Sequence, residues 1–312
     1  MNTLRNLIPH PGYLNRIRIY LKEMYPVPKR LISAVLMYLS FTELLRQNYG
    51  VRSPLISLSS FVGIASVFSF LLILRLMDEL KDKEVDLALF CDRPLPSGRV
   101  QESDIRFSLV LVVMFFVAIN SLCGSALGMG LVVLGYAFLM FKYFFIPELL
   151  SKHLVLNLIS HNPIVPLVFL YLVVSFAQEH HLDVRSMNWR VNISLIVMYW
   201  SMSFAWEIAR KIRSDVEENA YVTYSRLFGK RGAVAIAAIA QTLTLAFGLL
   251  FASLNSLSLA FTTVCVAGYA AVMWGHLRFV LNPNPRTSQL RPWAEQFMLS
   301  VAAAGCIEAL VL

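Results

Sequence analysis

The chain has 312 residues, of which 57% are hydrophobic and only 15% are charged, and its formal net charge is +8 at pH 7. Soluble domains carry about a quarter charged residues, so this composition excludes one soluble globular domain and favours a polytopic helical membrane protein. In such a protein the net positive charge reflects membrane topology, and we expect no nucleic-acid partner. The four Cys residues are scattered without ligand spacing and predict neither a disulfide framework nor a zinc site.

Residues 1–29 are rich in cations and lack the central apolar run of a signal peptide. The stretch YLNRIRIYLKEMY places four apolar side chains roughly on one helical face, opposite its cations: Leu14, Ile17, Leu21 and Met24. Such a helix is typical of the membrane interface, where cations meet acidic lipid headgroups. We therefore expect a cytoplasmic interfacial segment that contacts membrane lipid, followed by a single transmembrane bundle over 30–312.

Apolar runs of roughly 17–25 residues, the length that crosses a bilayer, occur in nine places along the chain. They fall near 30–48, 55–77, 106–125, 127–146, 163–178, 192–209, 232–252, 256–280 and 294–312. The fifth is short and contains proline. The expected fold is therefore all-α, a bundle of about nine transmembrane helices, and no oligomeric state follows from the pattern.

The distribution of Lys and Arg predicts the orientation of this bundle. With nine spans, all of the 27 Lys and Arg residues fall on one side except four: Arg46, Arg52, Arg185 and Arg190. The positive-inside rule places the basic side in the cytoplasm. Two long polar loops, 78–105 and 207–231, lie on that side. We expect an integral protein of a bacterial inner membrane with an active site that faces the cytoplasm.

The first polar loop opens with a run of acids directly after the second span. If the helix continues through them, four carboxylates line one stripe of it: Asp78, Glu79, Asp82 and Asp86. Like charges at this spacing repel one another unless a cation lies among them. Oxygen ligands without His or Cys favour Mg²⁺ or Ca²⁺, and Mg²⁺ typically takes one or two carboxylates together with water and phosphate. The alternative is an ordinary solvated helix end.

The run DELKDKEVD (78–86), followed by RPLPSG (93–98), resembles the first aspartate-rich motif of the UbiA superfamily of intramembrane prenyltransferases. The family pattern is N/D-D-x-x-D-x-x-x-D, a short spacer, and R-P-L-x-S/A-G. Asp78 falls on the leading N/D, and the three acids correspond to Glu79, Asp82 and Asp86. The resemblance implies that these three bind Mg²⁺ and that Asp78 contacts the substrate. It also implies that Arg75 and Arg93 are catalytic donors to a diphosphate.

A second acidic stretch, WEIARKIRSDVEENAYVTYSRLFGKRGA, follows the sixth span, where the family has its second motif. Its VTYSRLFG portion is similar to the family's T-L-x-x-x-x-G tail. Glu207, Lys211 and Asp215 step by four and are expected to share a helical face, with Glu207 and Asp215 as metal ligands. The family usually has Asp in place of Glu207 and Lys211. Two interpretations follow: this side holds a metal weakly, or Lys211 and Arg210 bind the phosphate directly.

Three further places carry candidate site residues. Lys142 in YAFLMFKYFF is similar to the family's Y-x-x-x-K/R stretch, although a helix-end Lys also extends to the interface without any catalytic role. Asn157 and His161, four residues apart, either orient an acceptor or form a satisfied packing pair. Glu43 lies inside the first span, where burying an ionisable group is costly, and is a candidate for lining the cavity.

The resemblance implies Mg²⁺-dependent transfer of a prenyl group from an isoprenoid diphosphate to an aromatic or other lipophilic acceptor. It assigns catalytic roles to Arg75, Arg93, Lys142 and Lys211. Two alternatives stay open. A terpene cyclase of the same family accommodates the departures at Glu79 and Lys211, and a transporter also fits nine basic-inside spans, although the sequence shows no intramembrane ion pathway.

Overall fold

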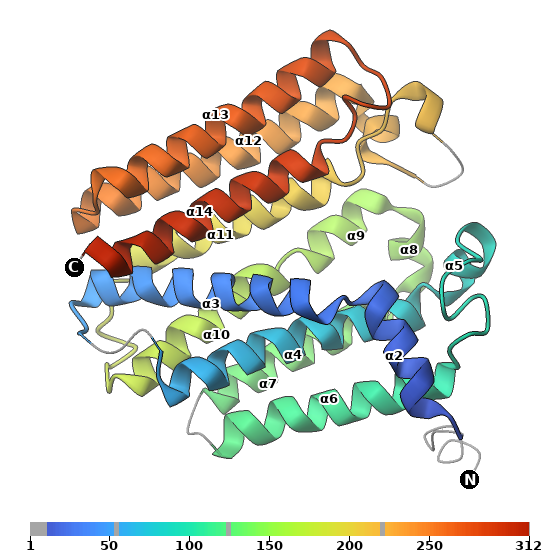
Figure 1. The fold of residues 1–312 in the computed structure, drawn as a ribbon, viewed down its shortest axis with the longest axis horizontal. Helices are drawn as coiled ribbons and strands as arrows, with labels where there is room; N and C mark the ends of the chain where they lie inside the picture. The colour runs from blue at the N-terminus through green and yellow to red at the C-terminus, as the bar shows by residue number, and fades with distance from the viewer. Residues whose placement is uncertain (1–10, 53–55, 123–125, 219–221, 312) are drawn as a thin grey trace. The chain divides into compact units, whose positions relative to one another are not determined.

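A computed structural model describes residues 11–52, 56–122, 126–218 and 222–311 (Figure 1). All regular structure in these ranges is helical, which confirms the all-α class. The chain divides into two compact units. Unit 1 comprises the residues up to Tyr38 together with Ile56–Asn157, and unit 2 comprises Leu39–Leu55 together with Leu158–Leu312.

Each predicted span coincides with a helix in the described residues. These helices are α3 (Val27–Tyr49), α4 (Leu58–Lys81), α6 (Glu102–Leu122), α7 (Leu127–Phe141), α10 (Ile164–Glu179), α11 (Trp189–Ala209), α12 (Tyr224–Asn255), α13 (Leu259–Leu281) and α14 (Arg291–Val311). Among the described residues, five segments are long and apolar enough to cross a membrane: Leu58–Lys81, Leu154–Glu179, Trp189–Ala209, Tyr224–Asn255 and Leu259–Leu281. A count of nine membrane spans therefore stays a prediction.

The fifth apolar segment begins earlier than predicted. A short helix, α9 (Leu154–His161), precedes α10, and the two together form the candidate span Leu154–Glu179. Pro163 lies between them. Proline has no backbone N–H and restricts the residue before it, so it separates two helices within one apolar run.

Unit 1 packs an amphipathic helix, α2 (Tyr13–Met24), against the helices that follow. Its core contains the buried side chains of Tyr20, Leu76, Val100 and Ile105, with Ile17, Leu21 and Met24 packed against them. Three of the four residues predicted to share a face of this helix therefore lie on its packed side. Leu14 does not, because it is 77% exposed. Short helices α5 (Lys83–Leu89), η1 (Tyr143–Phe145) and α8 (Pro147–Lys152) complete the unit.

Unit 2 contains four long helices, α11 to α14, which lie lengthwise beside one another (Figure 1). The α13–α14 contact is close because glycines face the partner helix. A Cβ atom on Gly268 would lie 2.7 Å from Ser300 Cβ, and one on Gly275 would lie 2.6 Å from Trp293 Cγ. Small residues that allow such close approach are typical of helix packing inside membranes.

Candidate active site

The first acidic stretch lies on two helices rather than one. Helix α4 ends at Lys81, α5 begins at Lys83, and Asp82 lies between them with φ −92° and ψ 9°. The predicted unbroken helical stripe is therefore wrong at Asp82. Carboxylates four residues apart repel one another along a continuous helix. Asp also has a low helix propensity, because its side chain bonds nearby backbone groups in non-helical conformations. The amides of Asp82 and Asp86 still donate to the carbonyls four residues earlier, so the acids stay close in space.

Glu79 is the most buried of these acids, with 1% of its surface exposed. Its Oε2 accepts a hydrogen bond from Arg75 Nη2 at 2.6 Å. Its Oε1 is buried and has no hydrogen-bond partner among the described residues. An unpaired buried carboxylate oxygen is costly, whereas a hard cation is the partner that such an oxygen prefers. The donor set at Glu79 therefore fits a divalent cation.

Asp86 is also buried, but both of its oxygens are engaged. Each accepts from Arg93 Nη1 at 2.7 Å, and the guanidinium of Arg93 lies 4.0 Å from the centre of the Phe90 ring. Arg93 opens the RPLPSG segment, whose turn requires the positive φ of 76° that Gly98 adopts. The Asp86–Arg93 pair thus holds this loop on α5.

Asp82 and Asp78 complete the cluster, and each contacts a side chain that is not an acid. The hydroxyl of Tyr143 donates to Asp82 Oδ1 at 3.4 Å, and Lys81 Nζ lies 3.5 Å from Asp78 Oδ1. Burial raises the pKa of Asp82, and Asp78 and Asp86 add to this effect, whereas Lys81 opposes it. Burial is thus the main reason why the Asp82 carboxyl resists ionisation.

Tyr143 was not predicted as a site residue. It follows Lys142 at the end of α7, in a turn where three successive non-glycine residues have positive φ: Tyr143 (48°), Phe144 (51°) and Phe145 (61°). Such conformations cost free energy and persist only where their surroundings enforce them. The turn directs the Tyr143 ring to Lys81, whose Nζ lies 5.0 Å from its centre. The Nζ of Lys142 itself lies 5.1 Å from the centre of the Phe141 ring.

No group of three His, Cys, Asp or Glu side chains in the described ranges forms a metal site by itself. Mg²⁺ commonly binds one or two carboxylates and takes its other ligands from water and substrate phosphate. The carboxylates at the end of α4 and on α5 match that partial role.

The second acidic stretch does not form the predicted shared face. Helix α11 ends at Ala209, and Asp215 opens the short helix η2 (Asp215–Glu217). The carbonyl of Lys211 accepts from the amide of Tyr224 at 3.1 Å, so the chain has already turned back after the helix end. Basic residues at a helix C-terminus favour such an end because they interact with its partial negative charge. Equal spacing in sequence therefore gives no common face here.

The side chains of this stretch are paired with one another in unit 2. Glu207 accepts from Arg210 at 2.5 and 2.8 Å, and Lys211 Nζ lies 3.7 Å from Glu207 Oε1. The side chain of Lys211 is only 12% exposed. Asp215 is 83% exposed and pairs with Lys230 at 2.6 Å. The Lys at position 211 thus directly offsets the charge of the neighbouring acid.

Two other acids fasten the loop. Glu217 Oε2 accepts from the hydroxyls of Ser214 and Ser288, each at 2.6 Å. Burial raises the pKa of Glu217, but the hydrogen bonds from these two serines outweigh that effect and the pKa is lowered. Glu218 accepts from Thr223 and from Ser225 at 2.7 Å. These contacts stabilise the loop structure.

The remaining predicted residues have modest surroundings. Glu43 is buried and accepts from Gln47 Nε2 at 2.9 Å and from Arg46 Nη1 at 3.4 Å, all on α3. Asn157 and His161 both lie on α9, but Asn157 belongs to unit 1 and His161 to unit 2. His161 Nδ1 lies 3.0 Å from Ser160 Oγ. Their predicted contact with an acceptor stays a prediction.

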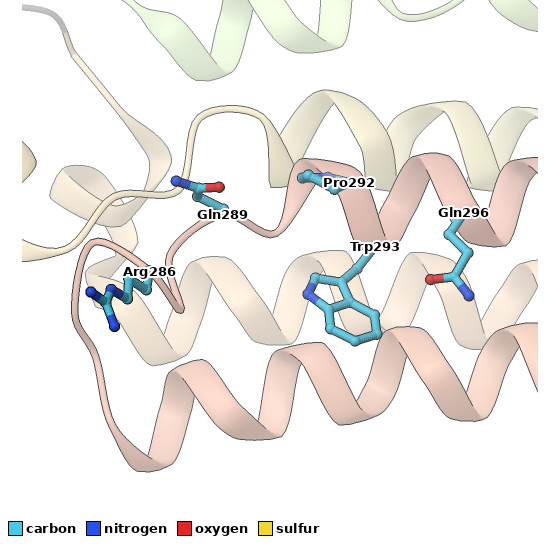
Figure 2. A pocket seen from close by; sticks show the side chains of 5 residues that line it. All are labelled: Arg286, Gln289, Pro292, Trp293 and Gln296. Atoms are coloured by element: carbon cyan, nitrogen blue, oxygen red, sulfur yellow. The ribbon is translucent and has the colours of Figure 1, made fainter.

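A pocket of about 340 Å³ opens in unit 2, at the start of α14 (Figure 2). It is lined by Arg286, Gln289, Pro292, Trp293 and Gln296. None of the predicted site residues line it. The ring of Trp293 packs close to Gly275, and none of these lining residues carries a carboxylate, so the pocket does not present the chemistry of the acidic stretches.

These observations define a helical integral membrane protein with a carboxylate-rich helix end suited to a cation. The model of the UbiA prenyltransferase family matches residues 35–301, and the chain belongs to this family. No curated protein matches the chain by sequence.

Two solved structures share the fold. One is described as a structure of digeranylgeranylglyceryl phosphate synthase in membranes. Its TM-score is 0.65 and its sequence identity is 16%, and the match covers 96% of this chain and 100% of that chain. The other is the apo structure of a UbiA homolog from Aeropyrum pernix K1, with a TM-score of 0.62, 15% identity, and coverage of 89% and 96%. At these identities the likeness concerns the fold alone.

Proposed function

We propose that the chain carries out Mg²⁺-dependent transfer of a prenyl group from an isoprenoid diphosphate to an aromatic or other lipophilic acceptor. The reaction takes place within the membrane, and the active site faces the cytoplasm of a bacterial inner membrane. Family membership supports intramembrane prenyl transfer. The observation that carries the metal assignment is the buried, unpartnered Oε1 of Glu79 beside Asp82 and Asp86.

Glu79, Asp82 and Asp86 would hold Mg²⁺, which when bound neutralises negative charge on a leaving diphosphate. Arg75 and Arg93 each have five N–H donors. Arg93 contacts Asp86 through Nη1 alone, and Arg75 contacts Glu79 through Nη2. Both guanidiniums therefore retain donors for phosphate oxygens. Lys142 and Asp78 extend this set in unit 1.

In unit 2, Arg210 and Lys211 supply further phosphate donors. Lys211 suits this role because its contact with Glu207 is long, at 3.7 Å, and its side chain is largely shielded from solvent. Glu207 and Asp215 are the proposed metal ligands here, and Asp215 must first release Lys230. For the acceptor we propose Asn157 and His161, with Glu43 lining the cavity.

The prenyl C–O bond breaks and the diphosphate leaves with the bonding electrons. A carbon of the acceptor then attacks the allylic cation and loses a proton. Water would capture this cation, so the site must exclude it. The RPLPSG loop supplies a cover that the Asp86–Arg93 pair keeps ordered.

Incubation of the purified protein with labelled farnesyl or geranylgeranyl diphosphate tests the proposal. We expect Mg²⁺-dependent diphosphate release that requires an aromatic acceptor. Release without an acceptor would favour a terpene cyclase, an alternative motivated by the partial neutralisation of Glu207 by Lys211. No release at any chain length would contradict both activities.

A further inference from the structure

Helix α2 is fastened to unit 1 by charged and polar contacts at both of its ends. At the start, Arg16 donates to both oxygens of the fully buried Asp104 at 2.6 and 2.8 Å. At the end, Arg99 donates to both oxygens of Glu23 at 2.5 and 3.0 Å. Bidentate Arg–carboxylate pairs fix orientation as well as distance. The helix thus has a defined position over the loop that follows the first acidic stretch.

Arg99 connects this contact to the RPLPSG segment. It also donates to the carbonyl of Asp92 at 2.6 Å and to the hydroxyl of Ser97 at 3.0 Å. One guanidinium therefore joins α2 to both ends of the loop that Asp86 and Arg93 hold. Helix α2 and the RPLPSG segment are therefore coupled through Arg99.

Tyr20 lies at the middle of α2 and is completely buried. It packs in one cluster with Leu76, flanked by Leu72 and Leu80, which lie one turn to either side on α4. Glu79 lies three residues after Leu76, so the same face of α4 carries it toward α2. The charges of Arg75, Glu79 and Asp78 all act on the Tyr20 hydroxyl.

The proton of the Tyr20 hydroxyl has no acceptor among the described residues, although the hydroxyl oxygen interacts with the side chain of Arg75. Burial raises the pKa of Tyr20, the carboxylates of Glu79 and Asp78 add to this effect, and Arg75 opposes it. The group therefore keeps its proton. The Oε1 atom of Glu79, one turn after Leu76 on α4, is likewise without a hydrogen-bond partner among the described residues. Leaving a buried donor unsatisfied destabilises the folded protein.

We propose that Tyr20 is a positioning residue for the cation site, acting on Glu79 through the Arg75–Glu79 pair. The hydroxyl, through its interaction with Arg75, constrains this pair so that Oε1 of Glu79 stays directed at the cation, and α2 holds the hydroxyl in place. The proposal rests on the proposed function, because it assumes that Glu79 is a metal ligand. It gives the N-terminal helix a role in the site in addition to membrane contact.

Mn²⁺ binding to the purified protein, followed by electron paramagnetic resonance, tests this role independently of activity. Removing an outer partner of a metal ligand typically weakens metal affinity by about 10–100-fold, and we expect a loss in this range for Tyr20→Phe. The matched control is Tyr13→Phe, which removes a hydroxyl from the same helix where it bonds Ser108 at 2.8 Å. We expect Tyr13→Phe to bind Mn²⁺ like the wild type.

A second variant, Glu23→Gln, keeps Tyr20 but breaks the contact with Arg99, and we expect a smaller loss of Mn²⁺ affinity. In the enzyme assay, Tyr20→Phe should raise the Mg²⁺ concentration for half-maximal rate while kcat recovers at saturating Mg²⁺. Equal Mn²⁺ affinity in the wild type and Tyr20→Phe would overturn the role of Tyr20 but leave the proposed function intact. Absence of binding in the wild type would overturn the metal site of the proposed function, and this role with it.

Discussion

Glu79 and Asp86 show how two buried carboxylates in one cluster take different roles. Both oxygens of Asp86 accept from Arg93, which satisfies its charge within the protein. Glu79 has one oxygen on Arg75 and one with no partner among the described residues. The unsatisfied oxygen is the one available to a ligand, so Glu79 should contribute most to cation binding.

Replacing Glu79 by Gln keeps the size of the side chain but removes the charge that attracts a divalent cation. We expect the Mg²⁺-dependent rate to fall by about a hundredfold or more, the scale seen when one preorganised charged partner is lost from an active site. The control is Glu84→Gln on the neighbouring helix α5, because Glu84 is exposed. Steady-state assays at several Mg²⁺ concentrations measure both variants. Equal activity of Glu79→Gln and the wild type would contradict the assignment.

We expect Asp82 to make cation binding dependent on pH. Its pKa is raised by burial, so it takes up a proton at a higher pH than a free Asp does. A protonated carboxyl binds Mg²⁺ poorly, and apparent Mg²⁺ affinity should therefore fall as the pH falls through the raised pKa. Titrations of Mn²⁺ binding across the acid range measure this, and Asp82→Asn should remove most of the dependence. A pH-independent affinity in the wild type would contradict it.

The raised pKa of Asp82 also determines whether the metal-free protein becomes more or less stable as the pH changes. The folded state binds this proton more tightly than the unfolded state does, so ionised Asp82 destabilises the fold above its raised pKa. Asp82 should therefore contribute a gain in the stability of the metal-free protein as the pH falls from neutrality through that pKa, whereas Glu217, whose pKa is lowered, contributes a loss at lower pH. Added Mg²⁺ should reduce this gain because it stabilises the ionised form.

At the scale of elements, the end of α11 decides what the second acidic stretch can do. The helix stops at Ala209, so Lys211 lies on a turn beside the ring of Tyr224, 5.8 Å from its centre, and contacts Glu207. A cation held in this way by an aromatic ring and an acid is suited to bind phosphate. The family's usual Asp at this position would instead add a second carboxylate.

Lys211→Asp distinguishes the two interpretations of this stretch. If Lys211 binds the diphosphate directly, the substitution should raise KM for the prenyl diphosphate by about tenfold or more, because a charged hydrogen bond contributes about 1.5–3 kcal/mol. If Lys211 instead weakens a metal site, the substitution should lower the Mg²⁺ concentration needed for half-maximal rate. Lys230→Ala, which removes an exposed pair with Asp215, is the control and should change KM little.

For the whole molecule, the sequence predicted the helices well because apolar runs must form helices in a bilayer. It failed where polar residues end or interrupt them. The acids at Asp78, Asp82 and Asp86 were expected on one helix, but their mutual repulsion accompanies a break at Asp82. Spacing alone also could not show that α11 stops before Lys211.

The candidate site was predicted in part. The spacing of acids and the RPLPSG run identified the first stretch, and the structure brings Arg75 to Glu79 and Arg93 to Asp86. Tyr143 was missed because its position depends on a strained turn, and Tyr20 because an aromatic residue on an amphipathic helix resembles any interfacial residue. Both are contacts between segments distant in the sequence, which local pattern does not encode.

The distribution of cations makes a prediction for the molecule in its membrane. If the positive-inside rule applies, the loop with RPLPSG faces the cytoplasm and the loop with Arg185 faces the opposite side. Cys91 is exposed just before RPLPSG, whereas Cys265 is buried. A membrane-impermeant maleimide should therefore label Cys91 in inverted vesicles but not in intact cells, and Cys91→Ser should abolish that labelling.

The matched probe is Ser186→Cys in the Cys91→Ser background, because Ser186 is exposed in the loop between α10 and α11. We expect its labelling to show the reverse pattern, in intact cells and not in inverted vesicles. Labelling of both positions from one side would contradict the predicted orientation. The number of spans between them would then be even, whereas three are predicted. Of the described segments between these positions, only Leu154–Glu179 is apolar and long enough by itself to cross a membrane. The experiment therefore tests whether the number of spans between the two positions is odd, and labelling from one side would mean that only one of α6 and α7 crosses.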